Sequence, residues 1–550
     1  AGTYTVTAAN VSGYTTPSSP LTVSVVNNQE TVVTVAYSAA PVVPPPGNVF
    51  GTHTNFESPQ TNPIRLSSGG ARLFAVNTDL NRVSVFSLSA PQSPARIAEI
   101  PVGIGPVSLW PKSEDEVWVV NQLSDSISVV SVSLGIVSDT IPCGDEPADI
   151  VMVGNYAYVT VARAKEVRVF DATTHALVTT LPLQGEYPRA LAVSPDASKV
   201  YVAFGLSGNH STIVARNAKK RPTQPAPVSG LPPIPGVGLI VDASDPAWTQ
   251  DDILFTLLDH DVAEISTNTR TLTRYFDKVG TINFNLAVNP VSGDVFVANT
   301  NAKNMGPAGE RTTVQSLRAN FVDNRITRIS TGSTPVVTPF DLNPGVNAAV
   351  LPNAEALATA LAQPSAVVFD PSGKFMWIAA LGTDRIAKVD INGNVLARIE
   401  IGNVTGSQAD PEHKRGPHGL ALSADGKYLY VQNRISNSLS VIETETASLK
   451  NELGVGAFDP TPTSIKEGRG YLYDAKLSGN GLSSCASCHV DGDVDGLAWD
   501  LSDPKGSMVN VFDPISNTYK SMHPMKGPMV TQSLGGLKGL APYHWRGDIA

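Results

Sequence analysis

Two cysteines and a histidine form the most chemically specific pattern in this sequence. Cys485, Cys488 and His489 lie in the order Cys-Ala-Ser-Cys-His. This spacing attaches a c-type haem through two thioether bonds and supplies the histidine as an iron ligand. Because the chain holds only 3 cysteines and 9 histidines in 550 residues, a chance match is rare. We therefore expect one covalent haem c, with His489 bound to its iron.

Two other chemistries use a Cys-x-x-Cys pair. A zinc knuckle needs two more ligands at short spacing, and the third cysteine, Cys143, lies far away in the sequence. A redox dithiol of the thioredoxin type lies in a βαβ context, whereas Gly, Ser and Asp surround this pair. The residues thus favour haem attachment, and Cys143 is expected to be a small, buried apolar side chain.

The sixth iron ligand would come from residues that follow the motif. The candidates are His523, Met522, Met525, Met529 and His544. A second histidine would close the iron, a methionine would also raise its reduction potential, and an open position would admit peroxide or another small ligand. A second, incomplete metal pattern starts at Asp491, where Asp-Gly-Asp-Val-Asp-Gly imitates an EF-hand calcium loop but has Ser502 in place of the final Glu.

The composition limits the class of protein. Charged residues make up 16% of the chain and the formal net charge is −10, so we expect no nucleic-acid partner. No run of about 20 apolar residues is present that could span a membrane. A hydrophobic content of 42%, with 45 Gly and 42 Pro, predicts a folded, mainly β protein with many turns and more than one domain.

The first 28 residues alternate apolar and polar positions in two runs, which predicts a β-hairpin. The run Gly-x-Tyr-x-Val-x-Ala-x-Asn resembles the last strands of an immunoglobulin-like domain, with Tyr4 at the tyrosine-corner position. Two strands cannot bury a core alone, so we expect the rest of that domain upstream of residue 1. Residues 29–63 are expected to form a stiff, Pro-rich linker.

Residues 64–455 repeat one unit, in which a Pro-containing start precedes an apolar strand, a turn and a strand rich in aromatic and β-branched residues. Seven copies of that second strand are recognisable, at 73–77, 117–121, 157–160, 200–203, 295–299, 375–379 and 428–433. A period near 40 residues with four short strands predicts a seven-bladed β-propeller. The repeats resemble the YVTN family of bacterial surface and periplasmic propellers. Insertions at 213–253, 302–320 and 334–362 stretch two of the copies, and the last contains a short helical pattern at 354–358.

Residues 456–550 differ in character, since the repeats stop there. Leu477, Ser478, Gly481 and Ser484 precede the Cys-x-x-Cys-His motif and Gly492 follows it, in a pattern that resembles the first haem domain of bacterial di-haem cytochrome c peroxidases. We expect a small cytochrome c domain, α-helical and rich in loops, that is truncated at its C-terminus.

The resemblance to the peroxidases implies further roles. That family places a distal histidine shortly before Lys-Gly-Pro, which matches His523. The run Tyr-His-Trp-Arg-Gly-Asp resembles the family's Phe-Trp-Asp-Gly-Arg, whose tryptophan lies between two haems and matches Trp545, although Arg546 and Asp548 are exchanged. Only one haem motif is present, so we expect a second haem module downstream of Ala550.

These observations predict an electron-transfer protein of the periplasm or cell surface, because haem c is attached outside the bacterial cytoplasm in such families. The propeller would serve as a docking platform for a redox partner protein or the second haem module. The alternative is a surface, adhesion or assembly protein, able to self-associate, whose propeller binds partners while the haem relays electrons. Whether the full-length protein is a peroxidase-like oxidoreductase stays open, because no acid or base near the iron can be named.

Overall fold

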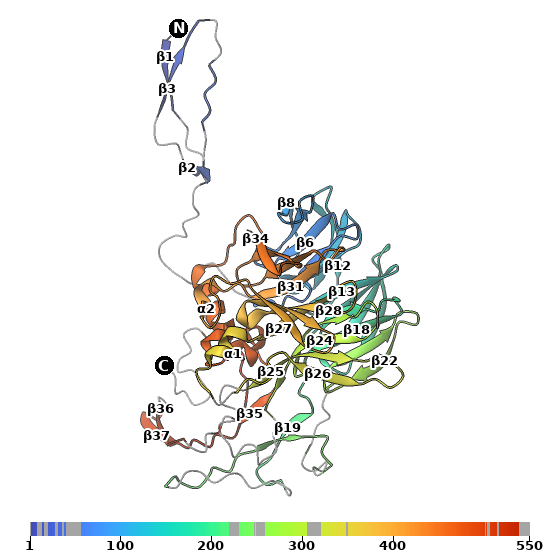
Figure 1. Ribbon diagram of the computed structural model, residues 1–550, viewed down its shortest axis with the longest axis vertical. Coiled ribbons are helices and arrows are strands. Elements are labelled where there is room, and N and C mark those ends of the chain that lie inside the picture. The colour runs from blue at the N-terminus through green and yellow to red at the C-terminus, as the bar shows by residue number, and fades with distance from the viewer. Residues whose placement is uncertain are drawn as a thin grey trace. The chain divides into compact units, whose positions relative to one another are not determined.

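The computed structural model divides the chain into two compact units, 1–54 and 55–550 (Figure 1). It describes residues 2–7, 14–15, 20–27, 31–35, 38–39, 57–218, 230–246, 248, 253, 259–304, 321–347, 350–500, 502, 506–513 and 516–537. In the first unit, β1 (Gly2–Val6) pairs antiparallel with β3 (Leu21–Val25), which confirms the hairpin. A second short pair joins β2 (Tyr14–Thr15) to β4 (Ser38–Ala39). The immunoglobulin-like resemblance stays a prediction.

The second unit contains seven four-stranded antiparallel sheets, each formed by one stretch of the chain. Blade 1 comprises β5 (Ile64–Leu66), β6 (Arg72–Asn77), β7 (Arg82–Ser87) and β8 (Ala95–Pro101), and blade 2 comprises β9 (Pro106–Pro111), β10 (Glu116–Asn121), β11 (Ser126–Ser131) and β12 (Ile136–Pro142). Blade 3 comprises β13 (Pro147–Val153), β14 (Tyr156–Val161), β15 (Glu166–Asp171) and β16 (Leu177–Pro182). Blade 4 comprises β17 (Glu186–Val193), β18 (Lys199–Leu206), β21 (Val262–Ser266) and β22 (Thr271–Phe276).

Blade 5 comprises β23 (Ile282–Val288), β24 (Val295–Ala302), β25 (Val322–Ile329) and β26 (Val337–Asp341). Blade 6 comprises β27 (Pro364–Phe369), β28 (Phe375–Ala380), β29 (Arg385–Asp390) and β30 (Val395–Glu400). Blade 7 comprises β31 (Pro417–Leu422), β32 (Tyr428–Asn433), β33 (Ser438–Glu443) and β34 (Ser448–Gly454). The first strand of each blade contacts the first strand of the next, and β31 contacts β5. The seven sheets therefore form a closed ring around a central channel, as predicted.

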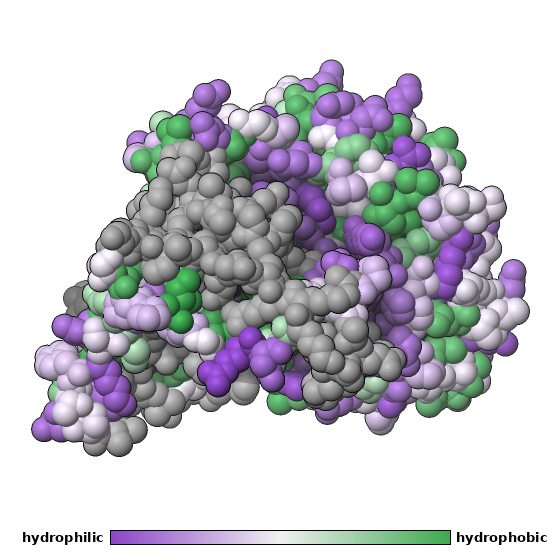
Figure 2. Space-filling model, turned by 90° about the horizontal axis from the view of Figure 1, so that it is seen from below, coloured by the Kyte–Doolittle hydropathy of each residue, from purple (hydrophilic) through white to green (hydrophobic). Residues whose placement is uncertain are grey.

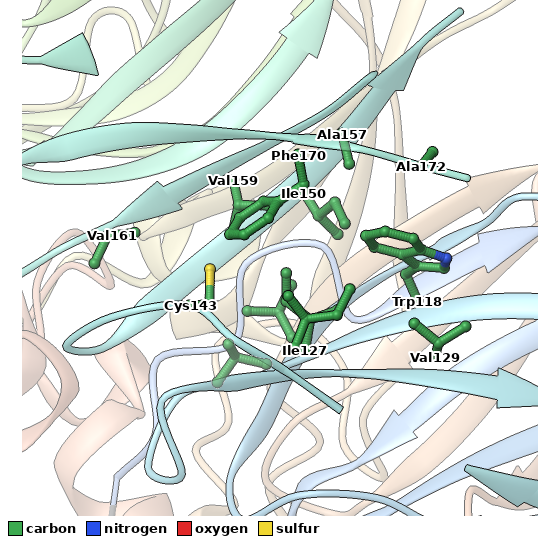
Figure 3. Close-up of a cluster of buried hydrophobic side chains, with 13 residues drawn as sticks. Trp118, Ile127, Val129, Cys143, Ile150, Ala157, Val159, Val161, Phe170 and Ala172 are labelled. Atoms are coloured by element: carbon green, nitrogen blue, oxygen red, sulfur yellow. The ribbon is translucent and has the colours of Figure 1, made fainter. Parts of the chain in front are cut away.

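The core lies between neighbouring blades. Each of the seven predicted strand copies is the second strand of a blade, and the apolar residues in its middle are buried on both faces. Between blades 2 and 3, Trp118 and Phe170 pack with Cys143, which has no exposed surface (Figure 3). Burial raises the pKa of the Cys143 thiol to about 12, so this cysteine is an inert core residue. The expectation for Cys143 is thereby confirmed.

The ring closes without exchange of a strand between the first and last blades. Side chains join them instead: the amide of Gln432 donates to the carbonyl of Val76 at 2.7 Å, and the amide of Asn437 donates to Asn77 at 3.1 Å. An apolar cluster of residues from blades 1 and 7, including Tyr430, completes the seam. Closure thus depends on packing and on buried amides.

Residues 60–62 cross the central channel. The carbonyl of Gln60 accepts hydrogen bonds from Arg189 at 2.7 Å and from His418 at 2.6 Å, which belong to blades 4 and 7. Asn62 donates to the buried carboxylate of Asp149 in blade 3 at 2.6 Å. We call residues 60–62 the channel segment, because it ties the inner strands of several blades together.

The insertions are partly ordered into short elements. In blade 4, β19 (Ser211–Val214) pairs with β20 (Leu239–Asp242) between the second and third strands of the blade. The predicted helical pattern at 354–358 is helix α1 (Ala354–Thr359), and Asn353 caps it by accepting from the backbone of Ala356. Most of the insertion at 302–320 lies outside the described residues.

The segment after blade 7 has one α-helix in its described part, α2 (Thr463–Tyr473), followed by short 3₁₀ turns. Two strand pairs follow: β35 (Ala498–Asp500) with β38 (Pro528–Val530), and β36 (Val509–Asp513) with β37 (Thr518–Met522). Figure 1 shows this segment, in orange and red, at the same side of the ring as α1. A helical cytochrome c domain is not shown; the segment is rich in loops. Among the described helices, none is long and apolar enough to cross a membrane.

Candidate haem-attachment site

The Cys-x-x-Cys-His motif forms a tight turn. Residues Cys485–Ser487 are a 3₁₀ turn, closed by reciprocal hydrogen bonds between Ser484 and Ser487. The backbone of His489 donates to the carbonyl of Cys485 at 2.9 Å, so the histidine follows directly on the turn. The small residues Ala486 and Ser487 fit inside this turn, where both are buried.

The reactive atoms of the motif differ in exposure. Cys485 is exposed, whereas Cys488 is half-buried and packs against the apolar cluster of Leu497 and Trp499. Burial raises the pKa of the Cys488 thiol, and the charge of Asp495 raises it further. The ring of His489 donates from Nδ1 to the carbonyl of Gln532 at 2.8 Å. That bond fixes the ring and leaves Nε2 for a metal, the usual arrangement of a ligating histidine.

Two arginines from the propeller hold the loop that follows His489. The carboxylate of Asp491 accepts from Arg434 at 2.5 Å through one oxygen and from Arg189 at 3.1 Å through the other. Burial alone would raise the pKa of Asp491, but the two guanidinium charges lower it to about 2. We call Asp491, Arg189 and Arg434 the arginine clamp.

Two buried amides hold the other side of the turn. Gln363 in blade 6 donates to the carbonyl of Ala486 at 2.9 Å, and its own oxygen accepts from Ser484 at 3.4 Å. Asn324 in blade 5 donates to the carbonyl of Leu482 at 2.9 Å and accepts from the backbone of Gln363 at 2.8 Å. Polar groups of four blades thus fix the motif on the ring.

Apolar contacts cover the same surface. Ala486 packs with Leu381 and Ile435 of blades 6 and 7, and Val490 packs with Ile282 and Phe284 of blade 5. The motif is consequently part of one compact body with the propeller.

The candidates for the sixth ligand lie in different surroundings. His523 is buried, with Nδ1 accepting from the backbone of Met525 at 3.0 Å and Nε2 donating to the carbonyl of Pro232 at 3.1 Å. Met525 is also buried, and Met529 lies opposite Trp499 in the β35–β38 pair.

Three predicted site residues remain, Met522, His544 and Trp545. Met522 ends β37, opposite Val509 on β36. His544 and Trp545 lie outside the described residues. Among the described residues, no hydrogen bond joins one of the ligand candidates to His489, and the partners of the His489 and His523 rings are the carbonyls of Gln532 and Pro232.

The calcium pattern at 491–502 receives no support from its donors. The carboxylate of Asp491 is taken by the arginine clamp, and that of Asp495 accepts from the indole of Trp499 at 2.8 Å. Within the described ranges, no group of three or more His, Cys, Asp or Glu side chains is arranged to hold a metal ion. Calcium at this loop stays an untested expectation.

The propeller histidines form hydrogen bonds in loops and at blade joints. His260 pairs with Asp277 at 2.6 Å and stacks on Tyr275 with ring centroids 4.0 Å apart. His413 pairs with Asp410 at 2.8 Å. His418 bonds the channel segment.

A large cavity borders the site. It has a volume of 1190 Å³ and is lined by loops of blades 2 to 4, by α2, and by residues that follow the motif. Tyr187 and Glu146 line it from the propeller, and Val490 and Leu534 from the C-terminal segment. The cavity is large enough for a small organic ligand.

Comparison with known proteins identifies the propeller. Residues 3–226 and 359–463, more than half of the chain, match the family described as lactonase, 7-bladed beta-propeller. The chain belongs to this family. No curated protein matches it.

Two solved structures are similar to this chain. Hydrazine synthase from Kuenenia stuttgartiensis has a chain that is 19% identical, with a TM-score of 0.52, covering 72% of this chain and 99% of that chain. Virginiamycin B lyase from Staphylococcus aureus is 13% identical, with a TM-score of 0.42, covering 68% and 92%. At 19% identity, the likeness to the hydrazine synthase chain shows the fold alone.

The sequence did not reveal the arginine clamp or the buried amides. Gln363 directly precedes the Pro that opens an inner strand, as do Gly105, Glu146, Tyr187 and Gly416 in other blades, and the structure gives all five positive φ. Because three of the five are not glycine, this position does not distinguish Gln363 in the sequence.

Proposed function

We propose that this chain is a c-type haem protein that transfers electrons outside the bacterial cytoplasm, with its haem seated on the propeller. Cys485 and Cys488 would hold the haem through thioether bonds, and His489 would bind its iron. The observation that carries the proposal is the hydrogen bond from His489 Nδ1 to the carbonyl of Gln532, which presents Nε2 as a ligand.

The surroundings fit a covalent haem. Cys485 is exposed and Cys488 is half-buried against the apolar cluster of Leu497 and Trp499, so the two attachment points lie where this buried cluster meets the solvent, and a haem bound there would be accessible for electron exchange. The haem supplies the redox chemistry when it is bound. The protein residues attach it, orient His489 and exclude water from one side.

The sixth ligand is part of the proposal. The family resemblance favours His523, which would have to exchange its hydrogen bond with Pro232 for the iron. Met525 and Met529 are the alternatives in the described part of the chain. A His/His haem would have a lower potential than a His/Met haem and would also lack the red absorption band of sulfur ligation.

Expression in a bacterial periplasm with a cytochrome c maturation system tests haem attachment. We expect the intact mass of the wild-type protein to rise by one haem and its band to stain for haem after denaturing electrophoresis. A Cys485→Ala, Cys488→Ala double variant should lose both signals, whereas Cys143→Ala, the matched control, should keep them. A wild-type protein without covalent haem would refute the proposal.

The ferric spectrum and activity assays distinguish the relay from an enzyme. A six-coordinate haem that neither binds carbon monoxide when reduced nor turns over peroxide supports electron transfer. Peroxide turnover supports an oxidoreductase of the peroxidase type.

The propeller would meet the redox partner. On the face drawn in Figure 2, hydrophobic residues of the described part form small patches between hydrophilic ones, which suits a transient, polar contact better than a permanent one. A soluble redox protein that binds transiently, rather than an obligate subunit, is therefore the partner that we propose.

A second candidate function is suggested by the family and the cavity together. The family description names lactonases, and the 1190 Å³ cavity has room for a small cyclic ester beside the hydroxyl of Tyr187. Hydrolysis of a lactone by the double cysteine variant, abolished by Tyr187→Phe, would establish this activity. Without turnover, the cavity is not a lactonase site.

A further inference from the structure

The arginine clamp connects the haem motif to two blades that are far apart in sequence. Asp491 follows His489 after a single residue, and its carboxylate is 15% exposed. Arg189 lies on the inner strand β17 of blade 4, and Arg434 directly follows β32 of blade 7. One carboxylate thus joins the loop of the haem histidine to opposite parts of the ring.

Both arginines are themselves fixed. The side chain of Arg189 is 2% exposed and donates its second Nη to the carbonyl of Gln60 at 2.7 Å. Arg434 contacts Glu57 at 3.5 Å and lies over the ring of Tyr473 at 5.5 Å. Each arginine is thus held by groups other than Asp491, and the clamp anchors the loop to the ring.

Backbone bonds carry this anchor to the histidine. The amide of Gly492 donates to the carbonyl of His489 at 3.0 Å, and the amide of Leu534 donates to the carbonyl of Gly492 at 2.9 Å. Gln532, whose carbonyl holds the His489 ring, is two residues before Leu534. The clamped loop therefore fixes both the histidine and the group that orients it.

We propose that Arg189, Arg434 and Asp491 are positioning residues for the haem, through which the propeller sets the orientation of His489 and the reduction potential of the iron. This inference rests on the proposed function. The propeller is then a part of the redox site, and its role is not limited to docking.

The charges of the clamp give the direction of each effect. Asp491 carries the single negative charge of the clamp and lies two residues after the iron ligand. Its removal therefore disfavours ferric iron and raises the reduction potential of the haem. Removal of the Arg434 charge has the opposite Coulombic effect. A change in the orientation of His489, caused by a substitution at Asp491 or at Arg434, would appear as altered g values of the ferric haem.

The test uses the 550-residue chain as a holoprotein, with covalent haem confirmed by mass. In Asp491→Asn we expect the ratio of reduced to oxidised haem at a fixed potential to rise about tenfold, which is about 59 mV for a one-electron couple. The matched control is Asp493→Asn, which removes the same charge from an exposed position of the same loop. Its potential and its electron paramagnetic resonance spectrum should stay close to those of the wild type.

Arg434→Lys keeps the charge but not the planar geometry of the guanidinium group. We expect altered g values in this variant and a smaller change in reduction potential than in Asp491→Asn. If Asp491→Asn does not fold, Arg434→Lys alone tests whether the clamp positions the haem. The inference is overturned if folded variants with covalent haem keep the wild-type spectrum and potential. A wild-type protein without covalent haem would instead overturn the proposed function, so the two failures are distinguishable.

Discussion

His418 is a titratable residue buried in the channel, where it donates from Nε2 to the carbonyl of Gln60. Burial, and then the charges of Arg434 and Arg189, lower its pKa from 6.5 to about 3. Between pH 6.5 and about pH 3, His418 therefore binds a proton in the unfolded chain but not in the folded chain. The contribution of His418 to stability is complete above pH 6.5 and is lost toward pH 3, at about 1.4 kcal/mol per pH unit.

His418→Gln removes this titration and retains an amide donor for the channel segment. We expect the free energy of unfolding of the wild type to fall more steeply than that of the variant between pH 7 and pH 4, as measured by urea denaturation at each pH. His413→Gln, at an exposed position, is the control and should follow the wild type. Equal slopes for wild type and His418→Gln would contradict the burial that the structure gives to this histidine.

The chemistry of single residues could be predicted from the sequence only where spacing along the chain carries it. Cys485, Cys488 and His489 are adjacent, so the motif and its expected haem are visible in the sequence. Arg189, on the first strand of blade 4, and Arg434, directly after the second strand of blade 7, are ordinary charged residues in the sequence, and only closure of the ring brings them to Asp491. No local pattern contains that information.

Helix α2 has two glycines with opposite structural roles. A Cβ on Gly470 would lie 1.7 Å from the carbonyl oxygen of Pro411, whereas a Cβ on Gly468 would meet nothing within 4 Å. Gly470 thus allows α2 to pack closely on the 3₁₀ turn Pro411–His413 that precedes blade 7. Gly468 only weakens the helix.

These two positions give a matched pair of variants. Gly470→Ala should lower the free energy of unfolding by about 3 kcal/mol, because a backbone group must move. Gly468→Ala should raise it by up to about 1 kcal/mol, since alanine favours the helix. Denaturant unfolding of the two variants checks both signs. If Gly470→Ala were as stable as the wild type, α2 would not pack on the turn as described.

The elements of the propeller were more predictable than those after it. Every blade repeats an apolar second strand near a Pro and a turn, so periodicity reveals the strand and its register. The segment after residue 456 has no repeat, and its short strands β35 and β38 pair across residues 501–527, which contain the separate pair β36 and β37. The peroxidase resemblance predicted a small domain there, α-helical and rich in loops, whereas the described residues have one α-helix, α2, with short turns and strand pairs, and they pack on the ring.

At the scale of the whole molecule, removal of the first compact unit and removal of the C-terminal segment from the second unit should have different effects. A chain that starts at residue 55 retains Glu57 and the channel segment, so its ring should unfold at the same denaturant concentration as that of the full chain. A chain that ends at residue 455 leaves Arg189 and Arg434 without Asp491 and uncovers the apolar residues beneath the motif. We expect its free energy of unfolding to fall by about 3 kcal/mol or more.

Circular dichroism during urea unfolding measures both truncations, with all chains made without haem maturation so that the haem does not contribute. An equally stable chain ending at residue 455 would mean that the C-terminal segment rests on the ring without stabilising it.

The channel segment also constrains the order in which the chain can reach its final structure. Gln60 is synthesised before every blade residue that bonds it, and its partners Arg189 and His418 follow 129 and 358 residues later. Contacts of such separation form late and slow the final step of folding. A nascent chain can complete single blades as they emerge, but the polar groups of the channel segment lack some of their hydrogen-bond partners until the seventh blade is made. A ribosome that stalls before blade 7 would therefore release a chain that chaperones and proteases recognise as unfinished.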